Sequence, residues 1–396
     1  MVKSVIVAGA RTPFGKFGGA LSSLTASDLG GIAIKGALEQ TNIKPEEVDE
    51  VIVGTVLQAG QGQIPSRQAA HKAGIPYTVK TETINKVCAS GLRSITLADQ
   101  LIRLGDERII VAGGMESMSN APYYLPQGRW GLRMGDGKLV DGVLHDGLTC
   151  AFHPDHVHMG VYGNETADKF TITREQQDAF AARSQQLAVK SIEAGIFAEE
   201  IVPVTIPQRK GEPVVVDTDE APRKGTTAES LAKLKPAFGK DGTVTAGNAP
   251  GINDGAAAVV VVAEDEAQKR GLEPLATVIG HAEIAIEPER FPETPGLIIE
   301  TILKKTGKTL EDIALFELNE AFSVVALTAN KLAGLDPEKV NVNGGAVALG
   351  HPIGASGARI VLTLAKELKR RGGGIGIAAI CSGGGQGDAI MIEVAP

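Results

Sequence analysis

Two cysteines and one histidine stand at glycine-rich junctions between expected strands and helices. Cys88 follows a strand-like segment and immediately precedes Ala89-Ser90-Gly91, where a helix is expected to begin. Unpaired backbone N–H groups at a helix N-terminus stabilise a thiolate, so we expect a nucleophile here with a lowered pKa. His351 lies in the turn Gly350-His351-Pro352. An imidazole can take the proton of a thiol near pH 7, which makes His351 the candidate base.

A second cysteine and an asparagine occupy similar junctions. Cys381 ends an apolar run and opens Ser382-Gly383-Gly384-Gly385, whose backbone N–H groups could bind an oxyanion. Asn319 precedes another expected helix, where it could equally serve only as an N-cap. An isolated cysteine is more often a buried packing residue. The shared position of these residues at strand and helix ends nevertheless favours acyl transfer through a cysteine.

Metal and nucleotide sites are weaker interpretations of the same sequence. His153, Asp155, His156 and His158 offer potential ligands within a few residues. Pro154 and the turn-like surroundings favour a mobile loop instead, so no metal site is expected. The glycine clusters lack the spacing of dinucleotide-binding and P-loop motifs, so no cofactor is expected either.

Short apolar runs alternate with helix-period stretches at both ends of the chain, which predicts an α/β fold with helices packed on buried sheets. The expected strands span Val2–Ala8, Val51–Gly54, Glu82–Asn85, Ile109–Ala112, Ala276–Gly280, Ala314–Leu318, Val340–Asn343, Ile375–Ile380 and Ala389–Val394. The expected helices span Ala26–Gln40, Ala89–Leu104, Pro295–Lys305, Ala321–Leu332 and Ala355–Arg370.

The two ends of the chain resemble copies of one unit. Ala89-Ser90-Gly91-Leu92-Arg93 recurs as Ala355-Ser356-Gly357-Ala358-Arg359, and each copy opens an expected helix that leads into an apolar strand. Residues 119–249 differ in composition, with glycine- and proline-rich segments around a polar helix expected at Arg174–Glu193. This segment is expected to be an insertion with a function of its own. Ala256–Val262 resumes the strand pattern and is expected to complete the first unit.

Composition excludes several classes of protein. The 396 residues carry 47 Asp and Glu against 39 Lys and Arg, a net charge of −8, which argues against nucleic acid as a partner. The apolar run Ala256–Ala263 is far shorter than the roughly 20 residues needed to span a bilayer. The opening segment lacks signal-peptide features, so a cytoplasmic location is expected. Three scattered cysteines are too few for a disulfide framework.

Four separated motifs resemble signatures of the thiolase family: Asn85 to Gly91, Asn319 to Phe322, Asn343 to Arg359 and Cys381 to Gly387. The resemblance covers nearly the whole chain. It implies two duplicated βαβαβαββ halves in five layers, α-β-α-β-α, with an inserted loop domain that binds coenzyme A. The expected domains are 1–118, completed by about 250–268, then the insertion 119–249, and the second half 269–396.

The resemblance also implies roles for individual residues. Cys88 resembles the nucleophile that becomes acylated, His351 the group that activates it, and Cys381 the acid and base at the α-carbon of acetyl-CoA. Asn319 resembles the residue that holds an oxyanion-hole water, and the N–H groups of Cys88 and Gly383 resemble a second oxyanion hole. The implied reaction is the reversible condensation of two acetyl-CoA to acetoacetyl-CoA and coenzyme A, by a homodimer or homotetramer without a cofactor.

Further positions match coenzyme A contacts of the family. They are Leu148, His158, Met159, Arg223, Ser230, Phe238, Ala246, Ala321 and Phe322. Pro250 stands where the family usually has a serine that contacts pantetheine, so that hydrogen bond is expected to be absent. Two extra residues precede His158 relative to common members. Met159 is similar to a methionine that closes the acyl pocket in the short-chain branch of the family.

Three alternatives stay open on the sequence alone. A broad-range degradative thiolase differs in chain-length preference. A decarboxylating ketoacyl synthase typically has a second histidine in place of Asn319. A non-catalytic acyl-CoA or lipid carrier of the same fold would be expected to have lost Cys88, His351 or Cys381, and all three are present.

Overall fold

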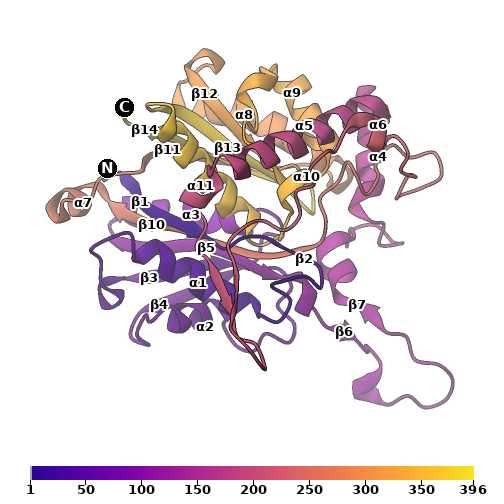
Figure 1. Ribbon diagram of the computed structural model, residues 1–396, viewed down its shortest axis with the longest axis horizontal. Coiled ribbons are helices and arrows are strands. Elements are labelled where there is room, and N and C mark those ends of the chain that lie inside the picture. The colour runs from indigo at the N-terminus through magenta and orange to yellow at the C-terminus, as the bar shows by residue number, and fades with distance from the viewer. Residues whose placement is uncertain (1) are drawn as a thin grey trace.

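The computed structural model describes residues 2–396, and its ten-stranded main sheet divides into two parts, here called the N-terminal and C-terminal sheets (Figure 1). The N-terminal sheet has the strand order β1-β10-β5-β3-β4, with the short strand β2 beside β10. These strands span Ser4–Arg11 (β1), Gly15–Lys16 (β2), Glu50–Gly54 (β3), Lys80–Ile84 (β4), Ile109–Ser117 (β5) and Asn253–Ala263 (β10). The segment Ala256–Val262 lies in β10, which pairs with β1 on one side and β5 on the other.

The C-terminal sheet has the order β12-β13-β14-β11. Its strands span Ala276–Ala285 (β11), Ile313–Leu318 (β12), Gly374–Ser382 (β13) and Gln386–Val394 (β14). The two sheets are continuous only where β1 pairs with β11, at Val5 with Thr277 and at Ile6 with Ala276. Apart from this short junction, each half forms its own sheet.

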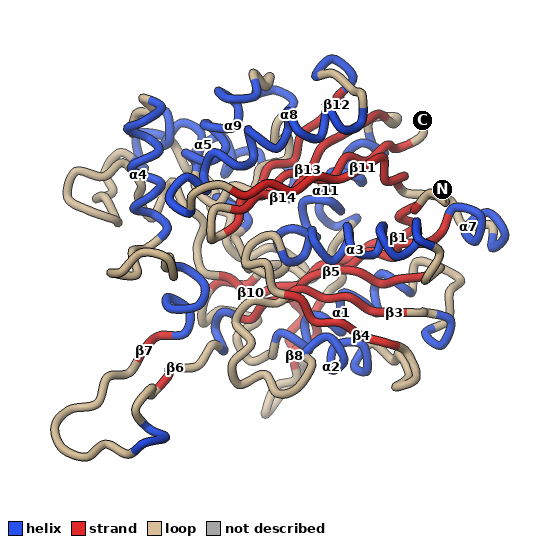
Figure 2. The backbone as a smooth tube through the Cα atoms, turned by 180° about the vertical axis from the view of Figure 1, so that it is seen from behind, coloured by secondary structure: helices blue, strands red, loops and turns tan. Residues whose placement is uncertain are grey.

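Helices cover both faces of both sheets, which gives the expected layer order α-β-α-β-α (Figure 2). Helices α1 and α2 pack on the outer face of the N-terminal sheet, and α8 and α9 on the outer face of the C-terminal sheet. Helices α3 and α11 lie between the sheets and contribute to one shared core. These helices span Ala26–Leu38 (α1), Pro65–Lys72 (α2), Ser90–Leu104 (α3), Thr294–Thr306 (α8), Ser323–Ala333 (α9) and Ser356–Arg370 (α11).

The repeated five-residue motif marks the place where the two central helices cross. A Cβ atom on Gly91 would lie 2.8 Å from the backbone nitrogen of Ala358, and one on Gly357 would lie 2.3 Å from the backbone nitrogen of Leu92. Glycine at both positions therefore allows the first turns of α3 and α11 to touch. This contact brings together the segments that precede the two helices, and these segments carry Cys88 and His351.

The segment between β5 and β10 holds smaller elements. They span Tyr123–Tyr124 (β6), Val140–Asp141 (β7), Met159–Phe170 (α4), Arg174–Glu193 (α5), Val204–Ile206 (β8), Val214–Val216 (β9) and Ala228–Leu231 (α6). Only the hairpin of β6 and β7 extends away from the body (Figure 1), while β8 joins the core outside the N-terminal sheet. The segment is tied to the N-terminal half by ion pairs with Arg11 of β1, which is fully buried. Its guanidinium contacts Glu200 at 2.6 Å and Asp219 at 2.7 Å.

One expected strand is absent, and five α-helices of the described residues were not predicted. In the segment Val340–Asn343 only Val340 makes a bridge, to Phe316. Asn341 has a left-handed backbone with φ of 47°, and its side chain bonds both backbone groups of Leu318, which replaces strand pairing. The unpredicted helices are α2, α4, α6, α7 (Glu264–Arg270) and α10 (Ala346–Leu349). None of the helices within residues 2–396 is long and apolar enough to cross a bilayer.

Candidate active site

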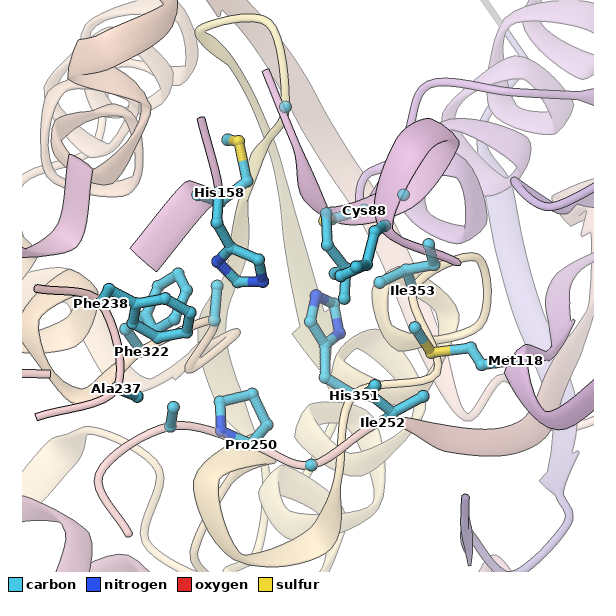
Figure 3. A pocket seen from close by; sticks show the side chains of 18 of the residues that line it. Cys88, Met118, His158, Ala237, Phe238, Pro250, Ile252, Phe322, His351 and Ile353 are labelled. Carbon is cyan, nitrogen blue, oxygen red and sulfur yellow. The ribbon is translucent and has the colours of Figure 1, made fainter. Parts of the chain in front are cut away.

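A largely apolar cavity of about 270 Å³ lies where the two halves meet the insertion (Figure 3). Cys88 and His351 lie on one side of it, and His158, Phe238 and Phe322 on the other. The cavity therefore combines the residues expected to do the chemistry with residues expected to contact coenzyme A.

The segment before α3 holds Cys88 in a constrained turn. Val87 has a left-handed φ of 45°, which costs a β-branched residue free energy and persists only where the surroundings enforce it. Ser90 enforces it here, because its hydroxyl donates to the carbonyl of Val87 at 2.6 Å and accepts the N–H of Lys86 at 2.8 Å. The result places the half-buried Cys88 at the cavity wall, where the N–H of Gly383 donates to its thiol.

The expectation of a lowered Cys88 pKa is wrong for the free protein. Burial raises the pKa of Cys88 to about 12, although hydrogen bonds from the N–H groups of Gly383 and Cys88 itself partly oppose that shift. Burial, together with the positive charge of Arg359, lowers the pKa of His351 to about 3. Thiol and imidazole are therefore both neutral at rest, rather than a thiolate and imidazolium pair. The sequence could not reveal this because the burying segments are distant along the chain.

His351 is buried and held through three atoms. Its backbone N–H donates to Asn253 Oδ1 at 3.0 Å, its Nδ1 lies 2.6 Å from Ser356 Oγ, and its Nε2 lies 3.4 Å from Asn319 Nδ2. The imidazole is thus fixed from both edges before any ligand binds.

Asn319 lies beside His351 and does not cap a helix. The N-cap of α9 is Phe322, so the alternative that Asn319 is only a cap is wrong. Asn319 is fully buried, and its Oδ1 has no hydrogen-bond partner among residues 2–396. A buried amide oxygen without a partner is costly and is suited to a bound water or ligand donor.

Cys381 lies near the end of β13 in a cluster with Phe291 and Phe322, and is fully buried. Burial raises the pKa of Cys381, and the negative charge that Cys88 carries when ionised raises it further. Cys381 is therefore a protonated thiol at rest, close enough to Cys88 for their charges to interact.

Most of the expected coenzyme A contacts line the cavity, and two do not. The residues at its wall are Leu148, His158, Met159, Phe238, Ala246, Ala321 and Phe322, together with Pro250. Arg223 and Ser230 are exposed on the insertion, outside the cavity lining. His158 stacks on Phe238 with ring centroids 4.3 Å apart, and burial lowers the pKa of His158 to about 4.

Two of the histidines near residue 155 use their Nδ1 atoms to accept hydrogen bonds from the nearby backbone. His153 Nδ1 accepts the N–H of Asp155 at 3.1 Å, and His158 Nδ1 accepts the N–H of Gly160 at 3.0 Å. Within residues 2–396, no group of three or more His, Cys, Asp or Glu side chains is arranged to hold a metal ion.

Sequence reasoning missed the residues that hold the loops in place. Glu116, fully buried on β5, accepts the N–H groups of Val56 at 3.0 Å, Leu57 at 3.2 Å and Gly354 at 2.9 Å. It therefore ties the loop after His351 to the N-terminal half, and burial raises its pKa to about 7. Glu116 could have been recognised from the sequence as a charged residue in an otherwise largely apolar strand.

Iodoacetamide should label Cys88 before the other cysteines, because Cys150 and Cys381 are buried while Cys88 is half-buried at the cavity wall. Because the thiolate is the reactive form and burial raises the pKa of Cys88 to about 12, the alkylation rate should keep rising with pH from pH 6 to 9. Peptide mapping after substoichiometric alkylation checks the site. A rate that levels off near pH 8, or first labelling at Cys150, would contradict this prediction.

A cysteine, a histidine and a second cysteine, brought together at the junction of two duplicated α/β halves, are the arrangement of a cysteine-dependent acyl-transfer enzyme. The family models are consistent with this class: the thiolase N-terminal domain matches residues 4–265 and the thiolase C-terminal domain matches residues 272–394. The chain belongs to the thiolase family.

Named relatives resemble the chain over nearly its whole length. The acetyl-CoA acetyltransferase of Thiocystis violacea is 52% identical over 389 residues, covering 98% of each chain. That of Cupriavidus necator is 52% identical over 393 residues, covering 99% of this chain and all of the relative. The crystal structure of the Bacillus anthracis acetyl-CoA acetyltransferase superimposes with a TM-score of 0.97 at 46% identity, covering 100% of this chain and 99% of the other.

Proposed function

We propose that the protein is an acetyl-CoA C-acetyltransferase that reversibly condenses two acetyl-CoA to acetoacetyl-CoA and coenzyme A. The observation that carries the proposal is the shared cavity of Cys88, His351 and Gly383, with the buried thiol of Cys381 beside Cys88. The names of the relatives support acetyl-CoA as the substrate.

The first half-reaction transfers an acetyl group to Cys88. His351 Nε2 takes the thiol proton while Sγ attacks the thioester carbonyl, and the coenzyme A thiolate then leaves with a proton from Cys381. This step forms the new thioester and leaves an imidazolium beside a Cys381 thiolate. Burial raises the pKa of Cys381, which keeps its thiol protonated before this step and makes its thiolate a stronger base for the next one. The N–H groups of Cys88 and Gly383 are suited to bind the oxyanion.

The second half-reaction forms the carbon–carbon bond. The Cys381 thiolate removes a proton from the α-carbon of a second acetyl-CoA, and the His351 imidazolium, with a water held by Asn319, stabilises the enolate oxygen. The enolate carbon attacks the acetyl carbonyl and Cys88 leaves as a thiolate. That thiolate takes the proton back from His351, which restores both thiols and the neutral imidazole. Dipoles and protons suffice for these steps, so we propose no cofactor.

The insertion is proposed to carry the coenzyme A subsite. Arg223 and Ser230 are exposed beyond the cavity, where they could meet the nucleotide end, while His158 and Phe238 form a flat apolar wall for pantetheine. Pro250 lines the cavity and has no side-chain donor. Compared with the serine usual in the family, Pro250 should therefore weaken coenzyme A binding equally for all acyl groups.

A cytoplasmic location stays a prediction.

Met159 should restrict the acyl chain. It lines the catalytic cavity and also a neighbouring cavity of about 680 Å³ that includes His145, Phe152 and His156. Its side chain therefore stands between the two spaces. Each excluded methylene forfeits roughly 0.8 kcal/mol, so kcat/KM for thiolysis should fall about 10-fold or more from four-carbon to six-carbon 3-ketoacyl-CoA.

A pair of methionine variants tests this restriction. Met159→Ala should flatten the chain-length dependence by opening the second cavity. Met118→Ala is the matched control, because Met118 lines the catalytic cavity but not the second one, and the variant should keep the wild-type ratio. A wild-type enzyme whose kcat/KM stays level or rises up to ten carbons would instead be a broad-range degradative thiolase.

The protein should form a homodimer or homotetramer. The hairpin of β6 and β7 protrudes from the body, and its loop exposes Trp130 at 79% and Met134 at 95% of their surfaces (Figure 1). Large apolar side chains so exposed are typical of a surface that another protein covers. Analytical ultracentrifugation at micromolar concentration should therefore give a multiple of 41.1 kDa. A monomer would refute this prediction, and Trp130→Asp with Met134→Asp should lower the assembly state if the hairpin takes part.

The direct test of the function is thiolysis of acetoacetyl-CoA. The purified protein should consume acetoacetyl-CoA in the presence of free coenzyme A, followed as loss of the magnesium-enolate absorbance, and yield two acetyl-CoA per turnover. Binding of acetoacetyl-CoA without its consumption would favour the non-catalytic carrier. Release of carbon dioxide from malonyl-CoA during condensation would favour the ketoacyl synthase alternative.

A further inference from the structure

We infer that Ser356 sets the tautomer of His351, so that Nε2 is the unprotonated nitrogen that faces the reaction. Ser356 is a positioning residue in this inference, because it contacts the imidazole and not the substrate. The inference rests on the proposed function only in taking His351 as the base for Cys88.

The hydrogen-bond inventory of Ser356 carries the argument. Its Oγ lies 2.6 Å from His351 Nδ1 and 3.0 Å from the carbonyl oxygen of Pro352, in a fully buried position. A hydroxyl has one hydrogen to donate and two lone pairs, and a carbonyl oxygen can only accept. The Ser356 hydrogen therefore goes to Pro352, and a lone pair of Oγ faces Nδ1. Nδ1 must then carry the imidazole hydrogen.

The contact at the opposite edge of the ring fits the same tautomer. Nε2 lies 3.4 Å from Asn319 Nδ2, which is an amide donor. An unprotonated Nε2 can accept a hydrogen bond from Asn319 Nδ2. A protonated Nε2 would place two donors opposite each other, with no acceptor between them. The two contacts, made by residues on separate elements, thus specify one arrangement.

The tautomer matters because the resting ring is neutral. Burial strongly disfavours the imidazolium, so only one nitrogen carries a hydrogen before reaction. With the hydrogen fixed on Nδ1, Nε2 can take the proton of Cys88. After that transfer both nitrogens carry hydrogen, and Nε2 becomes a donor toward an oxyanion while Nδ1 keeps its bond to Ser356.

The serines of the two motif copies, Ser90 and Ser356, play equivalent structural roles. Ser90, which occupies the equivalent place at the start of α3, bonds the carbonyl of Val87 and the N–H of Lys86 and so shapes the turn that holds Cys88. Ser356, at the start of α11, bonds the carbonyl of Pro352 and the ring of His351. The duplicated serine thus positions the nucleophile in one half and the base in the other.

The tautomer can be measured on the wild-type protein without any substrate. Protein labelled with ¹⁵N-histidine should show, for the signals that disappear in His351→Gln, a protonated Nδ1 and an unprotonated Nε2 at pH 7. A protonated Nε2 with a bare Nδ1 would overturn the inference. The measurement does not involve a thioester, so its outcome is independent of whether the protein condenses acetyl-CoA.

Ser356→Ala then tests the consequence. The rate of Cys88 alkylation by iodoacetamide should fall about 10- to 100-fold, as is typical when the partner that orients a histidine is removed, and the nitrogen signals of His351 should change. Ser94→Ala is the matched control, because it removes a buried hydroxyl of α3 that bonds only the carbonyls of Gly91 and Gly113. An unchanged alkylation rate and unchanged His351 signals in Ser356→Ala would refute the role. If that variant fails to fold, the wild-type spectrum alone decides.

Discussion

Replacing Cys381 with alanine should separate the two half-reactions. Proton removal from the α-carbon has no other candidate base at this position, so condensation should fall by about 10²- to 10⁴-fold, the usual contribution of general acid–base catalysis. Acetylation of Cys88 should fall by no more than about 10-fold, because water can protonate a departing thiolate, which is a good leaving group. Rapid-quench measurement with labelled acetyl-CoA gives both rates.

Cys150→Ala provides the control for the Cys381 variant. Cys150 is also buried and lies in the same apolar cluster as Cys381, so the two substitutions remove equal volume from one core. The control should keep both half-reactions near wild type. Equal losses of acetylation and condensation in Cys381→Ala would show that Cys381 has no selective role in carbon–carbon bond formation.

Replacing Cys88 with serine should have the largest effect on activity. The hydroxyl keeps nearly the same volume, but His351, whose pKa burial lowers to about 3, is too weak a base to activate an alcohol. Acetylation, condensation and thiolysis should therefore all fall by about 10⁴-fold or more, on the scale seen when a nucleophile is removed.

Binding should survive in this variant. Coenzyme A titrated into Cys88→Ser should bind within a few-fold of its wild-type affinity, because the flat wall of His158 and Phe238 is untouched. Retention of more than a hundredth of wild-type thiolysis in Cys88→Ser would mean that another residue is the nucleophile.

Local patterns were sufficient to predict the α/β class and most strands of the main sheet, whereas the order of the five layers was implied by the family resemblance. The helix expected at Arg174–Glu193 has those bounds in α5, and the repeated motif at Ala89 and Ala355 correctly indicated two copies of one unit. Such features depend on hydrophobic period and turn residues, which neighbours in the sequence determine. The strand expected at Val340–Asn343 failed because a side chain, that of Asn341, satisfies the backbone of Leu318.

The candidate site was predicted in its residue types but not in its electrostatics. The helix start before Ser90 indicated a stabilised thiolate, yet the pKa of Cys88 depends on how deeply distant segments bury it. The contact of Ser356 with His351 was likewise hidden, since neither residue type alone indicates a hydrogen bond across a turn. Arg223 and Ser230 are exposed outside the cavity because of the way the insertion packs against the two halves. The spacing of residues along the sequence does not specify that packing.

The most direct test of the proposed two-cysteine mechanism is to identify the acyl-enzyme. The wild-type protein is mixed with acetyl-CoA, quenched in acid within its first turnovers, and mapped by peptide mass spectrometry. The mechanism predicts one acetyl group per chain, as a thioester on the peptide that contains Cys88, and its disappearance when free coenzyme A is added before the quench. An acetyl group on Cys150 or Cys381 instead, or steady acetoacetyl-CoA turnover with no acetylated Cys88, would contradict it.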